Sequence, residues 1–161
     1  MITVLTGPPG SGKSLALVTR IAAEYAGRPI FYAHIDDLKL PWLRVENPRD
    51  WQSFLPVDGV LIVDEAQKFW PKRPINATVP PDIMALAEHR HAGVDIVLAC
   101  PNPGMLDKFV LECVGRFQFF HRALGLQAAT IFTWDGFEEA YKSPSRQAMA
   151  VVDRWNFPKE G

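Results

Sequence analysis

The sequence predicts an α/β fold with a mostly parallel central sheet, helices on both faces of that sheet, and additional antiparallel edge strands near the C-terminus. Short apolar runs alternate with helix-like segments over the first two thirds of the chain, and their connections are too long for hairpins. Further on, two aromatic-rich runs lie close together, which indicates a hairpin at one edge. With 161 residues, 48% of them hydrophobic, we expect a single domain spanning residues 1–161.

The first predicted elements are a strand, a glycine-rich loop and a helix. Residues 2–5 are an apolar, partly β-branched run that ends near Gly7, which is typical of a buried parallel strand entering a turn. In residues 13–26 the apolar positions recur at helical spacing. Gly27 and Pro29 follow as a stop signal, so we expect the helix to end there.

The rest of the chain continues this alternation of strands and helices. Further buried strands are predicted at residues 29–33, 59–63 and 94–99, and helices at residues 47–54, 82–91 and 105–114. Asn47 and Pro48 suit the N-cap and first turn of the second helix, and Gly93 suits the end of the third. The antiparallel pair is predicted at residues 116–121 and 129–134, with one more short strand within residues 148–155.

Composition disfavours several classes of protein. The chain has 17 Lys and Arg against 18 Asp and Glu, so the basic excess typical of a nucleic-acid-binding domain is missing. Cys100 and Cys113 lie in apolar surroundings without metal-binding spacing, and we expect buried, reduced thiols. No apolar stretch approaches the roughly 20 residues of a membrane-spanning helix. Four prolines within residues 71–81 predict a surface loop.

A phosphate-binding motif follows the first strand. Residues 7–14 match G-x-x-x-x-G-K-[ST] at every fixed position, between a predicted strand and a predicted helix. The glycines permit a backbone whose N–H groups converge on phosphate oxygens, and Lys13 would contact the β and γ phosphates as a catalytic cation. The Ser14 hydroxyl would bind a Mg²⁺ ion bridging those phosphates. The alternative is a glycine-rich turn with Lys and Ser after it by chance. The motif predicts a P-loop nucleoside triphosphatase whose nucleotide-binding residues are Gly7, Pro8, Pro9, Gly10, Ser11, Gly12, Lys13 and Ser14.

Two carboxylates end the apolar run at residues 59–63. Asp64 and Glu65 would then lie at the carboxyl end of a buried strand, where open α/β sheets bind their ligands. We expect Asp64 to hold the metal and Glu65 to orient and polarise the attacking water, which favours hydrolysis over transfer to an acceptor. Alone, such a pair is more often a solvated turn, and the phosphate-binding motif favours the catalytic interpretation.

Asn102 and Arg90 are further candidates with open alternatives. Asn102 follows the strand at residues 94–99 and would contact the γ phosphate as a sensor, although a turn-forming Asn explains the residue equally well. Arg90 lies at the end of a predicted helix, where a cation complements the helix dipole. Alternatively, Arg90 acts as a catalytic finger in the site of a neighbouring subunit, which requires a ring-like oligomer.

The five tryptophans also allow two interpretations, base stacking and core packing. The tryptophans could stack nucleobases, but packing in the core is the more common role. Trp70, which enters the proline-rich loop, could also anchor a subunit contact. The five are Trp42, Trp51, Trp70, Trp134 and Trp155.

The chain resembles the zonular occludens toxin family, which includes the filamentous-phage assembly ATPases. Residues 1–14 and 63–67 carry motifs generic to P-loop proteins, whereas Glu-His-Arg-His-Ala-Gly at 88–93 and Asn-Pro-Gly-Met-Leu-Asp-Lys at 102–108 are more family-like. The resemblance covers the whole chain. After the fourth strand the family often has Thr-Gln, whereas this chain has Cys100-Pro101-Asn102, so the resemblance does not support Asn102 as the sensor.

The resemblance implies a cytoplasmic domain that binds and hydrolyses ATP with Mg²⁺. Members of the family look like bacterial inner-membrane proteins. The resemblance therefore implies a full-length protein that contacts the membrane through a segment absent from this chain. The resemblance also implies a homo-oligomer with phage assembly or envelope proteins as partners.

Three functions remain open from the sequence: a motor-type ATPase, a small-molecule kinase with the same loop, and a non-catalytic module ordered by nucleotide. A kinase would close the loop at residues 71–81 over its acceptor. No guanine-reading Asn-Lys-x-Asp segment is present, which favours ATP over GTP.

Overall fold

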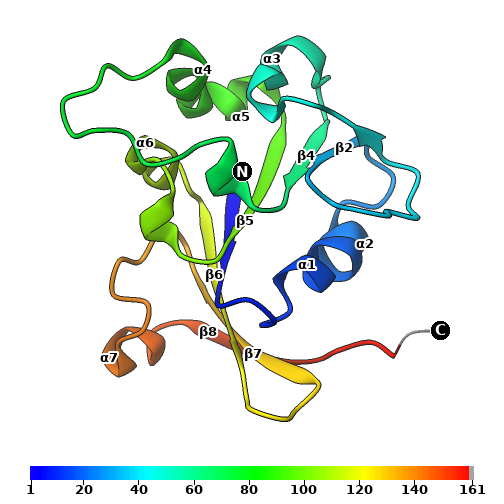
Figure 1. Ribbon diagram of the computed structural model, residues 1–161, viewed down its shortest axis with the longest axis vertical. Coiled ribbons are helices and arrows are strands. Elements are labelled where there is room, and N and C mark those ends of the chain that lie inside the picture. Colours follow the sequence, from blue (N-terminus) through cyan, green and yellow to red (C-terminus); the bar gives the residue numbers. More distant parts are fainter. Residues whose placement is uncertain (160–161) are drawn as a thin grey trace.

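The computed structural model describes residues 1–159 and contains one eight-stranded sheet (Figure 1). Its strand order is β3-β2-β4-β5-β1-β6-β7-β8. The first six strands in this order pair in parallel, and the last two pairings, β6 with β7 and β7 with β8, are antiparallel. The strands are β1 (Ile2–Thr6), β2 (Ile30–Ala33), β3 (Leu43–Arg44), β4 (Val60–Val63), β5 (Asp95–Cys100), β6 (Arg116–Arg122), β7 (Ala128–Trp134) and β8 (Val151–Asn156).

Helices cover both faces of the sheet. One face carries a single continuous helical segment, made of α1 (Lys13–Ala16), a π-helical stretch (Leu17–Ile21) and α2 (Ala22–Glu24). Its Leu17 and Ile21 pack in a core cluster with Leu5. The core cluster on the other face of the sheet contains Ile83 and Leu86, and short helices surround it. The remaining helices are α3 (Trp51–Phe54), α4 (Pro81–Met84), α5 (His89–Ala92), α6 (Lys108–Glu112) and α7 (Pro144–Gln147), with 3-10 turns at Pro48–Asp50, Ala66–Lys68, Ala85–Glu88 and Pro103–Met105.

The predicted fold class is confirmed, with three differences in detail. The strand predicted at 116–121 is not confined to the edge, because β6 also pairs in parallel with β1. The helix predicted at 105–114 begins too early: Leu106 is extended, and α6 starts after Asp107, whose side chain accepts a hydrogen bond from the Phe109 N–H at 2.8 Å. Neither β3 nor α7 was predicted, since each is too short to show a periodicity. Residues 160 and 161 of the predicted domain lie outside the described part.

Parallel pairing brings the polar segments of the sequence to one edge of the sheet. Thr6, the last residue of β1, is in register with Cys100 of β5 and Phe119 of β6, and Val63 of β4 is in register with Leu98. The residues that follow these strands therefore meet at the carboxyl edge, where ligands of such sheets bind. This arrangement positions the candidate site described next.

Candidate nucleotide-binding site

The loop between β1 and α1 has a backbone that requires glycine. Gly7, Gly10 and Gly12 have φ angles of 152°, 81° and 102°, which side-chain-bearing residues rarely adopt. A Cβ atom at Gly7 would also lie 2.6 Å from the Phe120 carbonyl oxygen and 2.7 Å from Ser11 Oγ. The Ser11 hydroxyl is buried without a hydrogen-bond partner in the described structure. The loop is a compact nest of backbone, as anion binding between a strand and a helix requires.

Lys13 is folded back onto this loop. Its side chain is 8% exposed, and Nζ donates hydrogen bonds to the carbonyl oxygen of Gly7 and, at 3.2 Å, to that of Pro8. Burial lowers the pKa of Lys13, and the nearby carboxylates of Asp64 and Glu65 partly offset this effect by favouring the charged form. A phosphate group at the loop would replace these carbonyl oxygens with fully charged acceptors, so the ammonium group is placed to bind a polyphosphate.

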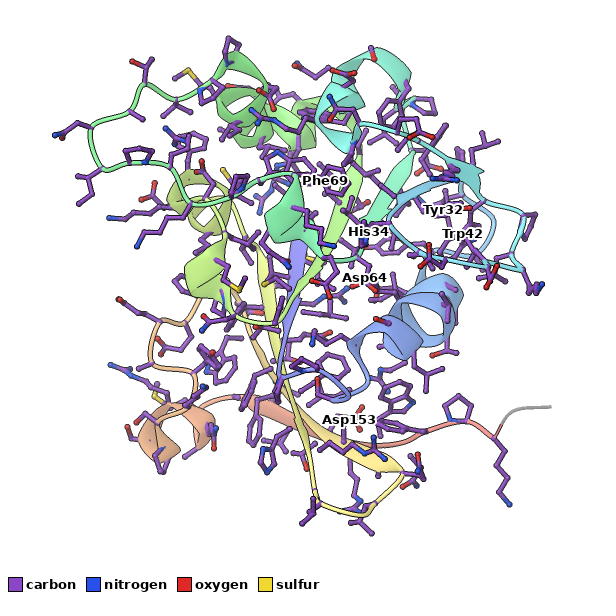
Figure 2. The ribbon with its side chains drawn as sticks, in the orientation of Figure 1. Tyr32, His34, Trp42, Asp64, Phe69 and Asp153 are labelled. Atoms are coloured by element: carbon purple, nitrogen blue, oxygen red, sulfur yellow. The ribbon has the colours of Figure 1, made fainter. Side chains whose placement is uncertain are left out.

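Ser14 and Asp64, separated by 50 residues in sequence, are hydrogen-bonded to each other. The Ser14 hydroxyl donates to Asp64 Oδ2 at 2.6 Å, and Asp64 Oδ1 accepts a hydrogen bond from the backbone N–H of Glu65 at 2.9 Å. Figure 2 shows Asp64 between α1 and the side chains of His34 and Phe69. A hydroxyl and a carboxylate are the hard oxygen ligands that Mg²⁺ prefers, so this pair fits the predicted metal site.

Glu65 has an unusual backbone for a residue with a long side chain. Its φ and ψ angles are 51° and 47°, in the left-handed region, and it immediately precedes the turn Ala66–Lys68. The Glu65 carboxylate accepts a hydrogen bond from the side-chain amide of Gln67. Backbone strain of this kind costs roughly 1–3 kcal/mol and clusters at functional sites. At this residue the backbone leaves the extended path of β4.

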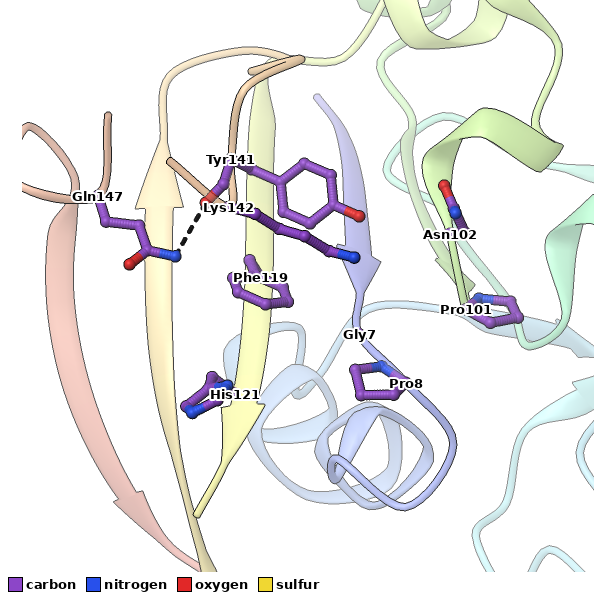
Figure 3. A pocket seen from close by; sticks show the side chains of 9 residues that line it. All are labelled: Gly7, Pro8, Pro101, Asn102, Phe119, His121, Tyr141, Lys142 and Gln147. Atoms are coloured by element: carbon purple, nitrogen blue, oxygen red, sulfur yellow. Dashed lines mark hydrogen bonds between the residues drawn. The ribbon is translucent and has the colours of Figure 1, made fainter. Parts of the chain in front are cut away.

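Asn102 has the turn-forming role that the sequence left open. It is the N-cap of the turn Pro103–Met105, and its Oδ1 accepts a hydrogen bond from the Gly104 N–H at 2.8 Å. The same residue also lines a cavity of about 420 Å³ that extends to Gly7 and Pro8 (Figure 3). Asn102 therefore adjoins the phosphate loop, while its carbonyl oxygen is already engaged.

The cavity beside the loop includes residues that sequence patterns did not single out. Tyr141 and Lys142 reach across it from the segment before α7, and Gln147 donates a hydrogen bond to the Tyr141 carbonyl oxygen at 3.1 Å (Figure 3). Phe119 and His121 of β6 form another wall. The segment from 135 to 147 carries no motif, so no sequence signal connected it with the phosphate loop.

Arg90 lies at the opposite end of the strands. It belongs to α5, which precedes the start of β5, and its guanidinium is next to Gly115, which precedes the start of β6. The phosphate loop follows the carboxyl end of β1, so Arg90 is not part of the site in its own chain. Its predicted role as a finger in a neighbouring subunit stays a prediction.

The tryptophans and cysteines mostly pack in the interior. Trp51 and Trp70 are 2% and 0% exposed, and Trp155 is also buried. This supports packing as the role of Trp70, whose predicted subunit contact has no exposed surface to make it. Both thiols are free, with Cys100 buried and Cys113 half-buried, and burial raises the pKa of Cys100 to about 12.

The fold and the loop define a class of protein. A parallel sheet whose first strand leads through a glycine-rich nest into a helix, with a carboxylate from a second strand at the helix start, is the architecture of P-loop nucleoside triphosphatases.

Within this class, the chain belongs to the zonular occludens toxin (Zot) family, whose model matches residues 1–160. It is 32% identical over 169 residues to a protein described as putative assembly protein ORF301 of Pseudomonas phage Pf3. That match covers 99% of this chain and 56% of the relative, so the chain spans about half of the relative's length.

Two solved structures have the same fold. The N-terminal domain of zonular occludens toxin from Neisseria meningitidis matches with a TM-score of 0.76 and 25% identity, over 98% of this chain and 94% of that one. The genome packaging NTPase B204 from Sulfolobus turreted icosahedral virus 2, solved with ATP-gammaS, matches with a TM-score of 0.62 and 16% identity, over 96% and 95% of the two chains. Among the described residues, no helix has both the length and the apolar character needed to span a membrane.

Proposed function

We propose that this chain binds ATP with Mg²⁺ and hydrolyses it. The observation that carries this proposal is the 2.6 Å hydrogen bond between Ser14 and Asp64, because it joins the phosphate loop to the carboxylate that follows β4. Two oxygen groups suited to a metal are thereby arranged beside Lys13, whose hydrogen-bond partners among the described residues are both neutral carbonyl groups. Such a combination suits a metal-bound polyphosphate.

Each residue has a distinct role in the proposed reaction. The backbone N–H groups of the loop and the Lys13 ammonium bind the phosphates and hold them in place. Ser14 and Asp64 hold the Mg²⁺ ion, which supplies charge neutralisation at the phosphates when bound. Glu65 orients a water molecule and accepts its proton, and the Gln67 amide holds the Glu65 carboxylate in position.

The biological role we propose is that of a motor domain in filamentous-phage assembly and export. Membership of the Zot family and the similarity to a phage protein described as an assembly protein support it. In the full-length protein, this domain would be cytoplasmic and attached to the bacterial inner membrane through a segment outside this chain. The proposed partners are phage assembly or envelope proteins. We also propose a homo-oligomer in which Arg90 of one subunit enters the site of the next, since Arg90 lies far from its own phosphate loop.

Phosphate release from MgATP tests the enzymatic part of the proposal. We expect release by the wild-type protein, none by Lys13→Ala, and wild-type rates from Lys39→Ala, which removes an exposed lysine. Glu65→Gln should bind MgATP and not release phosphate. Equal release from the wild-type and Lys13→Ala proteins would refute hydrolysis at this loop. ATP-dependent phosphorylation of added nucleosides, faster than hydrolysis, would instead establish a kinase.

A further inference from the structure

An aromatic side chain contacts the phosphate loop at Gly12. A Cβ atom placed on Gly12 would lie 2.8 Å from two ring atoms of Phe157 and 3.2 Å from the Trp155 ring, so both rings contact this glycine directly. Phe157 follows β8. This strand is the edge strand of the sheet, and β1 lies between it and β4 in the strand order. A residue near the end of the described chain thus packs directly on the loop that follows β1.

The Arg122 guanidinium lies over one face of this ring, 5.3 Å from the centre of the Phe157 ring. The same group donates hydrogen bonds to the carbonyl oxygens of Gly10, at 3.1 Å, and Leu126, at 2.7 Å. A flat aromatic ring and a flat guanidinium, both half-buried, therefore face each other beside the phosphate loop. Such planar groups are typical partners of a nucleobase.

The segment that carries Phe157 is anchored independently of any ligand. The Phe157 N–H donates a hydrogen bond to the Gln127 carbonyl oxygen at 2.8 Å. Arg20, on the helical segment that follows the loop, pairs with Asp153 at 2.9 Å and lies 5.5 Å from the centre of the Trp155 ring. Figure 2 shows Asp153 below the loop, on β8, the strand that precedes Phe157. The position of the ring is therefore set before a nucleotide arrives.

The orientation of a nucleotide follows from the order of the strands. The pair Ser14 and Asp64 lies toward β4, and a Mg²⁺ ion that it held would neutralise charge at the terminal phosphates. In the sheet, β4 and β5 lie on one side of β1, and β6, β7 and β8 lie on the other. A triphosphate whose γ end points toward β4 extends its nucleoside toward β6 and β8, where Arg122 and Phe157 meet.

We infer that Phe157 is the stacking platform for the nucleobase, and that the base inserts between this ring and the Arg122 guanidinium. This inference rests on the proposed nucleotide binding and adds the residues that bind the base. Stacking uses the face of the ring, which every base can contact, so the platform contributes affinity for nucleotide over free polyphosphate.

A comparison of two ligands tests the inference and separates it from the proposed function. Binding of ATP and of inorganic tripolyphosphate, each with Mg²⁺, is measured by calorimetry for the wild-type and variant proteins. We expect Phe157→Ala to weaken ATP binding roughly 5- to 150-fold, the range for loss of one base stack, and to leave tripolyphosphate binding unchanged. Phe157→Trp should retain ATP binding. Phe109→Ala, which truncates a half-buried ring on α6, should affect neither ligand.

Any other result for Phe157→Ala would overturn the inference, and each such result has a distinct meaning. Equal weakening of both ligands by Phe157→Ala would show that the ring only supports the loop at Gly12. Unchanged binding of both would show that the base lies elsewhere, while nucleotide binding at the loop stands. Lys13→Ala should abolish binding of both ligands, and its failure to do so would refute the phosphate site itself.

Discussion

The left-handed backbone of Glu65 predicts an inverted order of stability between two substitutions. In most contexts alanine is more stable than glycine by about 0.4–1 kcal/mol, because glycine has more conformational freedom to lose on folding. At a left-handed position, alanine and other residues with a Cβ are strained by about 1–2 kcal/mol, and glycine is not. With φ of 51° at Glu65, the second effect exceeds the first. We therefore expect Glu65→Gly to be more stable than Glu65→Ala by about 0.5–1 kcal/mol.

Thermal and urea unfolding of the two variants measure this difference. For a domain of this size, it corresponds to a melting temperature higher by about 1–4 °C for the glycine variant. Both variants lose the carboxylate and the hydrogen bond from Gln67, so these losses cancel in the comparison. Glu112, the exposed last residue of α6, provides the control, since its alanine variant should be the more stable one. If the alanine variant at 65 were also the more stable, the backbone there is not left-handed and the reasoning is wrong.

Three further predictions concern the metal pair, the loop and a buried histidine. Ser14→Ala should weaken binding of MgATP more than binding of metal-free ATP, as measured by calorimetry. The control is Ser53→Ala, which removes an exposed hydroxyl that is hydrogen-bonded to a backbone carbonyl and should change neither affinity. Gly12→Ala should abolish nucleotide binding, because the φ angle of 102° and the adjacent rings both exclude a Cβ; wild-type affinity would contradict this. His89 is 5% exposed, and burial lowers its pKa, so the folded state favours the neutral ring. Its contribution to stability should be complete above about pH 6.5, the ordinary histidine pKa, and lost as the pH falls through the lowered value. Urea unfolding at pH 7.5 and 5.5 should show a smaller change for His89→Gln than for the wild-type protein.

The phosphate loop shows how much a sequence can determine locally. Its roles depend on glycines, Lys13 and Ser14 within eight consecutive residues, and the strand and helix around them have clear apolar patterns. The structure places the same residues in a glycine-dependent nest with Lys13 folded against it. Asp64 and Glu65 were also predictable, because a buried parallel strand brings its following residues to the ligand-binding edge. The left-handed backbone of Glu65 was not predictable, since nothing in the local composition requires it.

Tertiary structure alone decided which distant segments lie beside the loop. The order of strands places Asp64 on one side of the loop and Phe157 on the other, and the pairing of β6 with β1 brings Arg122 to Gly10. Arg90, in contrast, lies at the other end of the strands, beside Gly115. A sequence pattern reports the local conformation and burial of a segment, because both depend on nearby side chains. The neighbours of a strand depend on packing across the whole core, so no periodicity within β6 or β8 could reveal them.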